Sequence, residues 1–526
     1  MEAHKKRTHT PENTKLLIWV WAFSVNVGKL MGLFPSIRQA KQETYQGKLK
    51  YLVGDTYVLF NFKHIITQKN SVVNMRESLS FDDGTSDCEV LAAYVQDLLE
   101  KAGPYAKLDR LSYASICTKE AFSKHMSIEC REALTNEVKL YCRCPSRETV
   151  KELLMANKAG LLYHKKEVEE KLLTNVYAFD SSSYYSSLLF NAEYPIGRLL
   201  RYKYTDEAAH QVIAQGKWFL IHGRCKEPVN YKYNILRPYS KAAGVVAPCD
   251  DGYYHYSIAP YDWLLIKDLF NVDILRDPDI EWTSLVVCTE IGRLNNEYLK
   301  LILDVYNRKE AANNLGERQY YKDALNMMLG KSYPRTLIET EDLLHWYHRP
   351  EHYFCPQFGV HMISLARYTT MKLAKQVGIN NVVSIVTDCI TSTSPDLIRV
   401  MNEHNNRVKN SILKYGFNTE IGQWKPEHRS FMVYFRSGTY VFENYSGKVK
   451  PVITGCRDAS SMVNSFSDIF KDNYLPKGLI VKRGNYFYDE PFPLWSSDEN
   501  RLKAQEDYKD EMEKLNQGVQ TWKEQS

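Results

Sequence analysis

The chain has 526 residues, of which 44% are hydrophobic and 25% are charged, as in an ordinary globular protein with several domains. Its net charge of +5 permits a nucleic-acid partner without requiring one, and its most apolar early stretch, LLIWVWAFSV, is too short to span a membrane. The close cysteine pair, Cys142 and Cys144, offers too few ligands for a structural zinc ion. We therefore expect reduced cysteines and a cytoplasmic protein with neither a secretory signal nor membrane association. The 37 tyrosines fit a tyrosine-rich core and base-stacking rings equally well.

Hydrophobic periodicity divides the chain into strand and helix segments. The first part predicts strands at 15–27 and 49–67, a helix at 86–102, mainly helical structure over 105–175, and over 177–189 a strand that ends in a polar turn at Asp180. The middle part predicts a small module of short strands at 196–285, a helix pair at 294–330 and an irregular segment at 331–358. The last part predicts a helix at 361–378, a strand at 382–386 with a turn at Asp388, a hairpin at 430–453, and an exposed or disordered charged tail from 496 on.

Two acidic turns and a basic helix stand out in this order. Asp180 and Asp388 each follow an apolar strand, and between them the segment YKDALNMMLGKSY carries Lys322 and Asn326. Two carboxylates at neighbouring strand ends can hold two divalent cations, and a lysine on a facing helix can neutralise a triphosphate. Each residue alone is more often a solvated turn or surface residue, so the ordered set carries the interpretation. The chain has neither a GxxxxGK[ST] loop nor an HExxH motif, and His361 is expected on a helix face rather than as a ligand.

The motifs around these residues resemble those of the protein-primed family B DNA polymerases of small phages and linear plasmids. The segment FDSSSYYSSL is similar to the palm motif Dx2SxYP, KDALNMMLG to the finger motif Kx3NxxYG, VTDCI to the DTD motif, and FRSGTY to the KxY hairpin. The helix segment GVHMISLARYTTMKLA and the thumb segment PVITGCRDAS also match. The resemblance covers about residues 15–495.

The resemblance implies a role for each matching residue. Asp180 and Asp388 would be the catalytic metal ligands, with the carbonyl of Ser181, and two Mg²⁺ ions would bind there, with Mn²⁺ able to substitute. The implied nucleotide-binding residues are Ser183, Tyr185, Lys322, Asn326 and one of the two cations Arg308 and Lys309. The implied DNA- and primer-binding residues are Lys158, Gly160, Arg436, Thr439 and Tyr440.

Several motif positions depart from the family pattern. Val386 occupies the first Asp position of DTD, Leu329 replaces the finger tyrosine, and Gly438 replaces the KxY lysine. These departures fit a divergent polymerase, and they also fit an alternative, a weakened or inactive homologue that binds DNA ends or a priming protein. A further alternative is a polymerase that makes or copies RNA. Tyr185 argues against it, because the resemblance implies that this ring excludes a 2′-hydroxyl.

The N-terminal region keeps little of the family's 3′–5′ exonuclease. The DxE position holds Thr8-His9-Thr10, and only Asp87 matches the Yx3D motif. One carboxylate cannot hold two metal ions. We therefore expect a reduced, exonuclease-like domain without proofreading.

The expected fold is of the α/β (α+β) class, a right-hand polymerase with palm, fingers, thumb and two insertions. The expected domains are 1–103 exonuclease-like, 104–195 palm with a helical lead-in, 196–295 insertion, 296–330 fingers, 331–358 short second insertion, 359–450 palm, 451–495 thumb and 496–526 charged tail. The expected function is DNA-templated addition of dNTPs to a 3′-hydroxyl, initiated on a terminal (priming) protein, to replicate a linear viral or plasmid genome. We expect a monomer, in the host cytoplasm if the genome is viral.

Overall fold

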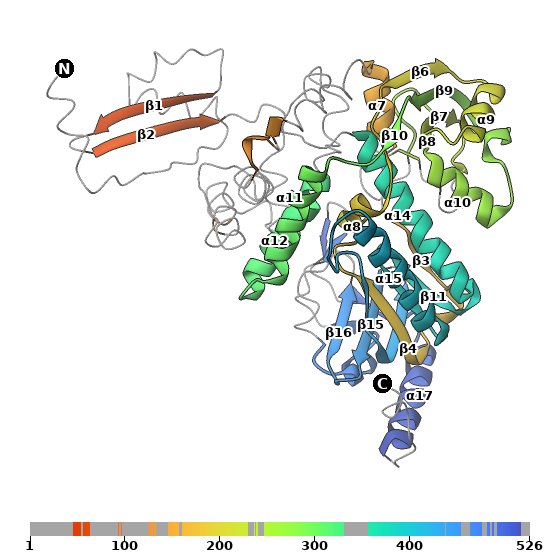
Figure 1. Cartoon of the computed structure of the whole chain (residues 1–526). Coiled ribbons are helices and arrows are strands. Elements are labelled where there is room, and N and C mark those ends of the chain that lie inside the picture. Colours follow the sequence, from red (N-terminus) through yellow and green to blue (C-terminus); the bar gives the residue numbers. More distant parts are fainter. Residues whose placement is uncertain are drawn as a thin grey trace. The chain divides into compact units, whose positions relative to one another are not determined.

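The computed structural model forms two compact units, Met1–Glu120 and Ala121–Ser526. It describes residues 46–53, 56–63, 93, 96, 126–129, 131–132, 146–156, 160–229, 236, 238–239, 247–330, 356–436, 438–453, 463–475, 481–483, 486–488 and 492–516. In the first unit, β1 (Gln46–Val53) and β2 (Thr56–Lys63) form an antiparallel hairpin (Figure 1). This hairpin confirms a strand pattern over most of 49–67, whereas the strand expected at 15–27 lies outside the described residues.

An eight-stranded sheet forms the centre of the second unit. Its order is β16-β15-β14-β4-β12-β11-β3, and β13 pairs with β4 beside β14. The strands are β3 (Leu162–His164), β4 (Leu172–Ser181), β11 (Val382–Val386), β12 (Cys389–Ser392), β13 (Trp424–Pro426), β14 (Arg429–Arg436), β15 (Thr439–Asn444) and β16 (Val449–Ile453). The order puts β4 in the middle of the sheet, although β12 and β14 come more than 200 residues later in the chain.

Helices from distant parts of the sequence pack on this sheet or on one another (Figure 1). They are α7 (Arg147–Met155), α8 (Tyr184–Asn191), α11 (Asn296–Glu310), α12 (Leu315–Gly330), α14 (Pro356–Val377) and α15 (Asp396–Lys414). The helix pair expected at 294–330 and the helix expected at 361–378 are confirmed by α11, α12 and α14. The hydroxyl of Tyr184 donates to the carbonyl of Ala366 at 2.9 Å, which fixes α8 against α14.

The segment expected as a small strand module is a four-stranded sheet with two helices. The sheet order is β6-β9-β7-β8, formed by β6 (Leu199–Lys203), β7 (Phe219–Cys225), β8 (Tyr254–Ile258) and β9 (Glu281–Cys288). The helices α9 (Asp206–Ala214) and α10 (Pro260–Phe270) were not expected from the sequence. A buried ion pair between Arg367 on α14 and Asp262 on α10 joins this module to the helices over the central sheet.

The charged C-terminal segment is a packed helix, so the expectation of an exposed or disordered tail is wrong for 498–516. In α17 (Asp498–Asn516), Ala504 is buried, and Tyr508 and Met512 pack on a core cluster with Phe431 of β14. The Arg501 guanidinium also donates to the carbonyl of Phe470 at 2.8 Å. Ala504, Tyr508 and Met512 are spaced about one turn apart, so they form one apolar stripe that packs a helix whose other faces are charged.

The expectation of mainly helical structure over 105–175 is also wrong at the end of that range. Residues Lys166–Val168 form one 3-10 turn, η5, and β4 begins at Leu172. Glu170 adopts φ 57°, which an α-helix does not tolerate, and Leu172 and Leu173 pair with Val433 and Met432 of β14. Tertiary pairing therefore overrides the charged helix-like pattern here.

The remaining described elements are short. They are β5 (Tyr194–Pro195), β10 (Ile291–Gly292), β17 (Tyr474–Leu475), β18 (Val481–Arg483), β19 (Tyr486–Tyr488), β20 (Phe492–Pro493), η7 (Ile274–Arg276), η9 (Ile379–Asn381) and η10 (Phe466–Phe470). Among the described helices, none has a stretch apolar and long enough for a membrane span. The second unit, with its separate sheets and many packed helices, belongs to the α+β class, as expected.

Candidate active site

Asp180 and Asp388 lie side by side at the centre of the main sheet. Asp180 is the next-to-last residue of β4, and its register partner on β12 is Cys389, the residue after Asp388. The backbone N–H of Ser181 donates to the carbonyl of Asp388 at 2.9 Å. Thr387 makes the tight β11–β12 turn possible by adopting φ 55°, and its hydroxyl donates to the Asp388 carboxylate at 2.7 Å. The turn therefore places the Asp388 carboxylate next to β4, the strand that carries Asp180.

The electrostatics of Asp180 show that negative charge is concentrated here. Its side chain still reaches solvent, yet protein atoms surround the carboxylate on most sides, and this desolvation together with Asp388 and Glu427 raises its pKa to about 6. The positive charges of Lys322 and Lys450 oppose the rise. Repulsion between neighbouring carboxylates is relieved when a divalent cation binds between them.

Glu427 is an acidic neighbour that the sequence interpretation missed. It follows β13, whose Lys425 is the register partner of Asp180, and its backbone N–H donates to the carbonyl of Ala178. Its carboxylate forms ion pairs with Lys450 at 3.0 Å and with the buried Arg429 at 3.4 Å. No motif marks Glu427, and only the pairing of β13 with β4 brings it near Asp180.

Lys309 is the cation that reaches the turn after Asp180. Its ammonium donates to the Ser183 hydroxyl at 2.9 Å, lies 2.8 Å from the Glu310 carboxylate, and is almost completely buried. Ser183 adopts φ 55° where α8 begins, so this bond holds a turn in an uncommon conformation. Arg308, the neighbouring candidate, instead pairs with Asp304 on its own helix at 2.9 Å. Of the two cations that the sequence left open, Lys309 contacts the site.

Tyr185 and Gly160 meet beside Asp388. A Cβ atom on Gly160 would lie 2.6 Å from the Tyr185 hydroxyl oxygen and 2.5 Å from Cγ2 of Thr387, so only glycine fits this contact. Burial and then the charge of Asp388 raise the pKa of Tyr185 to about 12, which keeps the phenol neutral at pH 7. The ring therefore forms one wall of the space next to the two aspartates.

The α12 helix faces the site with side chains that remain free to meet a substrate. Lys322 and Asn326 are one turn apart on this helix and both are exposed. The Lys322 charge acts on Asp180, which places the ammonium within electrostatic range of the carboxylates.

The β14–β15 hairpin, whose residues were expected to bind the primer, is packed into the protein instead of lying open on the surface. Thr439 and Tyr440 are buried, and the Tyr440 ring stacks on Tyr434 with a centroid separation of 5.3 Å. The guanidinium of the buried Arg429 lies 5.4 Å from the Tyr440 ring, and Arg436 donates to the carbonyl of Pro493 at 2.7 Å. These residues join the sheet to β20, a packing role that the sequence did not predict, while primer binding by them stays a prediction.

The predicted site residues thus divide into three groups. The structure gathers Asp180, Ser181, Ser183, Tyr185, Gly160, Lys309, Lys322 and Asp388 around the centre of the sheet, and Asn326 lies one turn from Lys322 on α12. Arg308, Arg436, Thr439 and Tyr440 are engaged in packing or ion pairs elsewhere. Lys158 and Asp87 lie outside the described residues.

The residues at the centre fit divalent cations of the magnesium type. Within the described residues, no group of three or more His, Cys, Asp and Glu side chains has the arrangement of a preformed metal cage. Mg²⁺ commonly uses one or two carboxylates and takes its other oxygens from water and substrate phosphates. Two mutually repelling aspartates are therefore a suitable donor set for such ions, and a poor one for zinc.

Comparisons with known proteins give structural similarity at low identity. Neither a family model nor a curated protein matches the sequence. Among solved structures, phi29 DNA polymerase complexed with primer-template DNA and incoming nucleotides is 14% identical, with a TM-score of 0.47, and 86% of this chain and 83% of that chain are covered. Its binary complex with primer-template DNA is 16% identical, with a TM-score of 0.49 and coverage of 86% and 83%. A family B DNA polymerase from the hyperthermophilic archaeon Pyrobaculum calidifontis is 12% identical, with a TM-score of 0.29 and coverage of 82% and 44%. The chain is similar to these proteins, while its α+β class follows from its own helices and strands.

Proposed function

We propose that the chain is a DNA-directed DNA polymerase that adds dNTPs to a 3′-hydroxyl. The observation that carries the proposal is the pair Asp180 and Asp388, joined across β4 and β12, with Lys322 and Lys309 beside them. Phosphoryl transfer needs positioning and charge stabilisation more than covalent catalysis, and this site supplies both. The polymerase motifs in the sequence coincide with the same residues.

The two aspartates would hold two Mg²⁺ ions, together with the carbonyl of Ser181. When bound, such ions lower the pKa of the attacking hydroxyl and stabilise the charge of the leaving pyrophosphate. Lys322 would bind the triphosphate from α12, with Asn326 one turn away. Lys309 would act by holding the Ser182–Ser183 turn, so that the N-terminus of α8 and its N–H groups face the phosphates.

Tyr185 would select the sugar of the incoming nucleotide. Its hydroxyl lies against Gly160, and the ring would meet a 2′-hydroxyl on the sugar of an incoming nucleotide. Equal incorporation of rNTPs and dNTPs would favour an RNA-making enzyme over this proposal.

The finer features of the proposal come from the resemblance. We propose initiation on a hydroxyl of a terminal (priming) protein, replication of a linear viral or plasmid genome, and no proofreading. In that scheme α11 and α12 act as fingers, the main sheet as palm, and the α9–α10 module as the insertion that meets the priming protein.

A primer-extension assay tests the central proposal. Wild-type protein with primer-template DNA, dNTPs and Mg²⁺ should extend the primer, and Asp388→Asn should not. Circular dichroism of both proteins checks that the substitution leaves the fold intact.

The main alternative is a non-catalytic homologue that binds DNA ends or a priming protein. Val386 favours it, because its side chain packs against the apolar cluster of Met432 and Tyr434 where the family pattern has an acid. If wild-type protein extends primers no better than Asp388→Asn yet binds DNA ends, this alternative replaces the polymerase proposal.

The raised pKa of Asp180 predicts weaker cation binding in acid. A protonated carboxyl is not a ligand, so below its pKa of about 6 a proton must leave when a cation binds. We expect the affinity for Mn²⁺, measured by electron paramagnetic resonance, to fall about tenfold from about pH 7 to about pH 5. In the metal-free protein the same group makes the opposite contribution, since a carboxyl with a raised pKa favours the folded state more at the lower pH. A pH-independent affinity, or the same pH dependence in Asp180→Asn, would contradict the assignment.

A further inference from the structure

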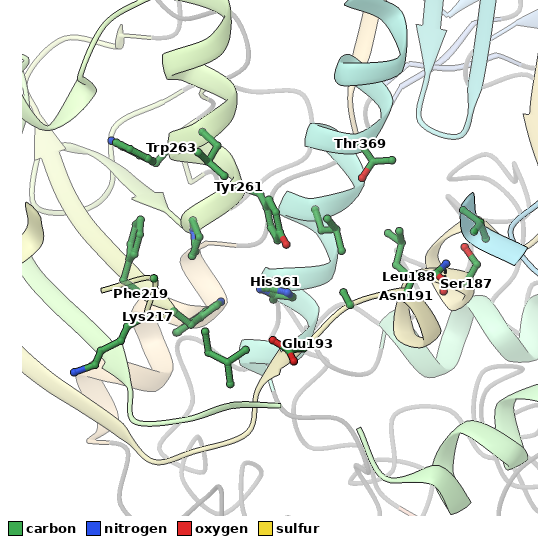
Figure 2. A pocket seen from close by; sticks show the side chains of 18 of the residues that line it. Ser187, Leu188, Asn191, Glu193, Lys217, Phe219, Tyr261, Trp263, His361 and Thr369 are labelled. Carbon is green, nitrogen blue, oxygen red and sulfur yellow. Dashed lines mark hydrogen bonds between the residues drawn. The ribbon is translucent and has the colours of Figure 1, made fainter. Parts of the chain in front are cut away.

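A cavity lies against α8, beside its residues Tyr184, Ser187 and Asn191. It has a volume of about 530 Å³, within the range of small-molecule sites, and its walls come from α8, α10, α14, α15 and the α9–β7 connection. Several aromatic rings contribute to these walls, among them Phe219, Tyr261 and Trp263. Figure 2 shows His361 in the middle of the cavity wall, between Tyr261 and Glu193.

Several buried polar atoms around this cavity have no hydrogen-bond partner among the described residues. The ring of His361 is only 5% exposed and is hydrogen-bonded to the backbone of Glu193, which leaves its other nitrogen without a partner among the described residues. The side-chain oxygen of Asn191 and the indole nitrogen of Trp218, both from lining residues, are unpartnered too. Buried donors and acceptors without partners are costly, so several of them around one cavity point to a guest that satisfies them.

The charge of the cavity favours a neutral guest. Burial lowers the pKa of His361 to about 4, and burial also lowers the pKa of the lining residue His404 to about 4, so both rings are neutral at pH 7. A neutral imidazole offers one donor and one acceptor. The exposed rim carries one charge of each sign, Glu193 and Lys217, which leaves no net charge to hold an ionised group.

We propose that this cavity binds a neutral, flat nitrogen heterocycle of nucleoside size, with its ring among Tyr261, Trp263 and Phe219 and its polar edge on His361 and Asn191. Flat aromatic guests gain most from walls of this kind. Donors and acceptors on one edge of the guest complement a neutral histidine and an amide oxygen.

The lining of the cavity includes neither of the two aspartates of the candidate active site, although Gly422 on its wall is hydrogen-bonded to Ser181 and Ser182. Consecutive residues of α8 face the two places, because Tyr185 contacts Gly160 whereas Tyr184 lines the cavity. A bound guest would therefore touch the helix that begins at the Ser183 turn without competing for the two aspartates. The proposal does not depend on the polymerase activity.

Binding of adenosine and cytidine to the full chain, without divalent ions, tests the proposal. Saturation-transfer NMR titrations should give saturable binding of at least one nucleoside, and free ribose should bind at least about tenfold more weakly. Val408 lines the cavity from α15, and its exposed neighbour Lys409 does not. Val408→Trp should fill the cavity and weaken binding at least about tenfold, whereas Lys409→Trp should leave it unchanged. His361→Phe keeps a flat ring without polar atoms and should weaken binding about tenfold.

Thermal melting of each variant establishes that it is folded before binding is compared. Absence of saturable binding of both nucleosides up to about 10 mM would overturn the proposal. Equal affinities of the two tryptophan variants would place any binding elsewhere and overturn it as well. Undiminished binding by folded His361→Phe, or equal binding of ribose and adenosine, would overturn the assigned ligand class.

Discussion

Replacing Asp180 with asparagine is expected to reduce dNTP incorporation by at least about 10³-fold, the scale of losing one charge that stabilises phosphoryl transfer. Asp180 and Asp388 are the two carboxylates that meet across β4 and β12, so neither has a substitute at the same place. The amide keeps the size of the side chain and removes its charge, so the loss reports on cation binding rather than on packing. Single-turnover primer extension at saturating Mg²⁺ measures the chemical step.

Glu427→Gln is the matched control for this experiment. Glu427 also lies near enough to raise the pKa of Asp180, but its own carboxylate is paired with Lys450 and Arg429. We expect its replacement to reduce incorporation by less than about tenfold, because a neighbouring charge tunes a site without being a ligand. A loss as large as that of Asp180→Asn would make Glu427 a third metal ligand, and a small loss in Asp180→Asn would contradict the two-aspartate site.

The sequence alone could predict the parts of this site that follow from local pattern. Apolar strands that end in Asp180 and Asp388 mark the carboxylates, and helical periodicity marks the basic face of α12. Their meeting across about 200 residues could be inferred only from the resemblance, because strand order depends on pairing that local pattern does not encode.

The features that the sequence did not predict depend on contacts between residues far apart in the chain. Glu427 approaches Asp180 only because β13 pairs with β4, and α17 is ordered only because the core around Phe431 accepts Ala504, Tyr508 and Met512. Tyr440 matches a motif position, yet the stacking of its ring on Tyr434 gives it a buried role. In each case the sequence shows the chemical type of the side chain, but it does not show which distant residue that side chain contacts.

The difference between Arg308 and Lys309 also depends on a long-range contact. Adjacent residues on a helix point about 100° apart, so only one of two neighbouring cations can reach the Ser182–Ser183 turn. Lys309 reaches it, with its ammonium on the Ser183 hydroxyl, while Arg308 turns to Asp304. Lys309→Met should therefore reduce incorporation about 10²-fold, because the turn after Asp180 loses its support in a site that tolerates little displacement.

Arg308→Met is the matched control, since it removes an equal charge one position away. Its ion pair with Asp304 is partly exposed, so we expect less than about a threefold loss of activity and a stability change below about 1 kcal/mol. Lys309→Met should also lower stability by about 1–2 kcal/mol, a limited cost because Arg318 remains 3.4 Å from Glu310. Urea unfolding measures the stabilities and primer extension the activities. If Lys309→Arg restores folding stability without restoring incorporation, the reaction requires the geometry of the turn and not the buried charge. Equal losses of activity in Arg308→Met and Lys309→Met would contradict the role of the turn.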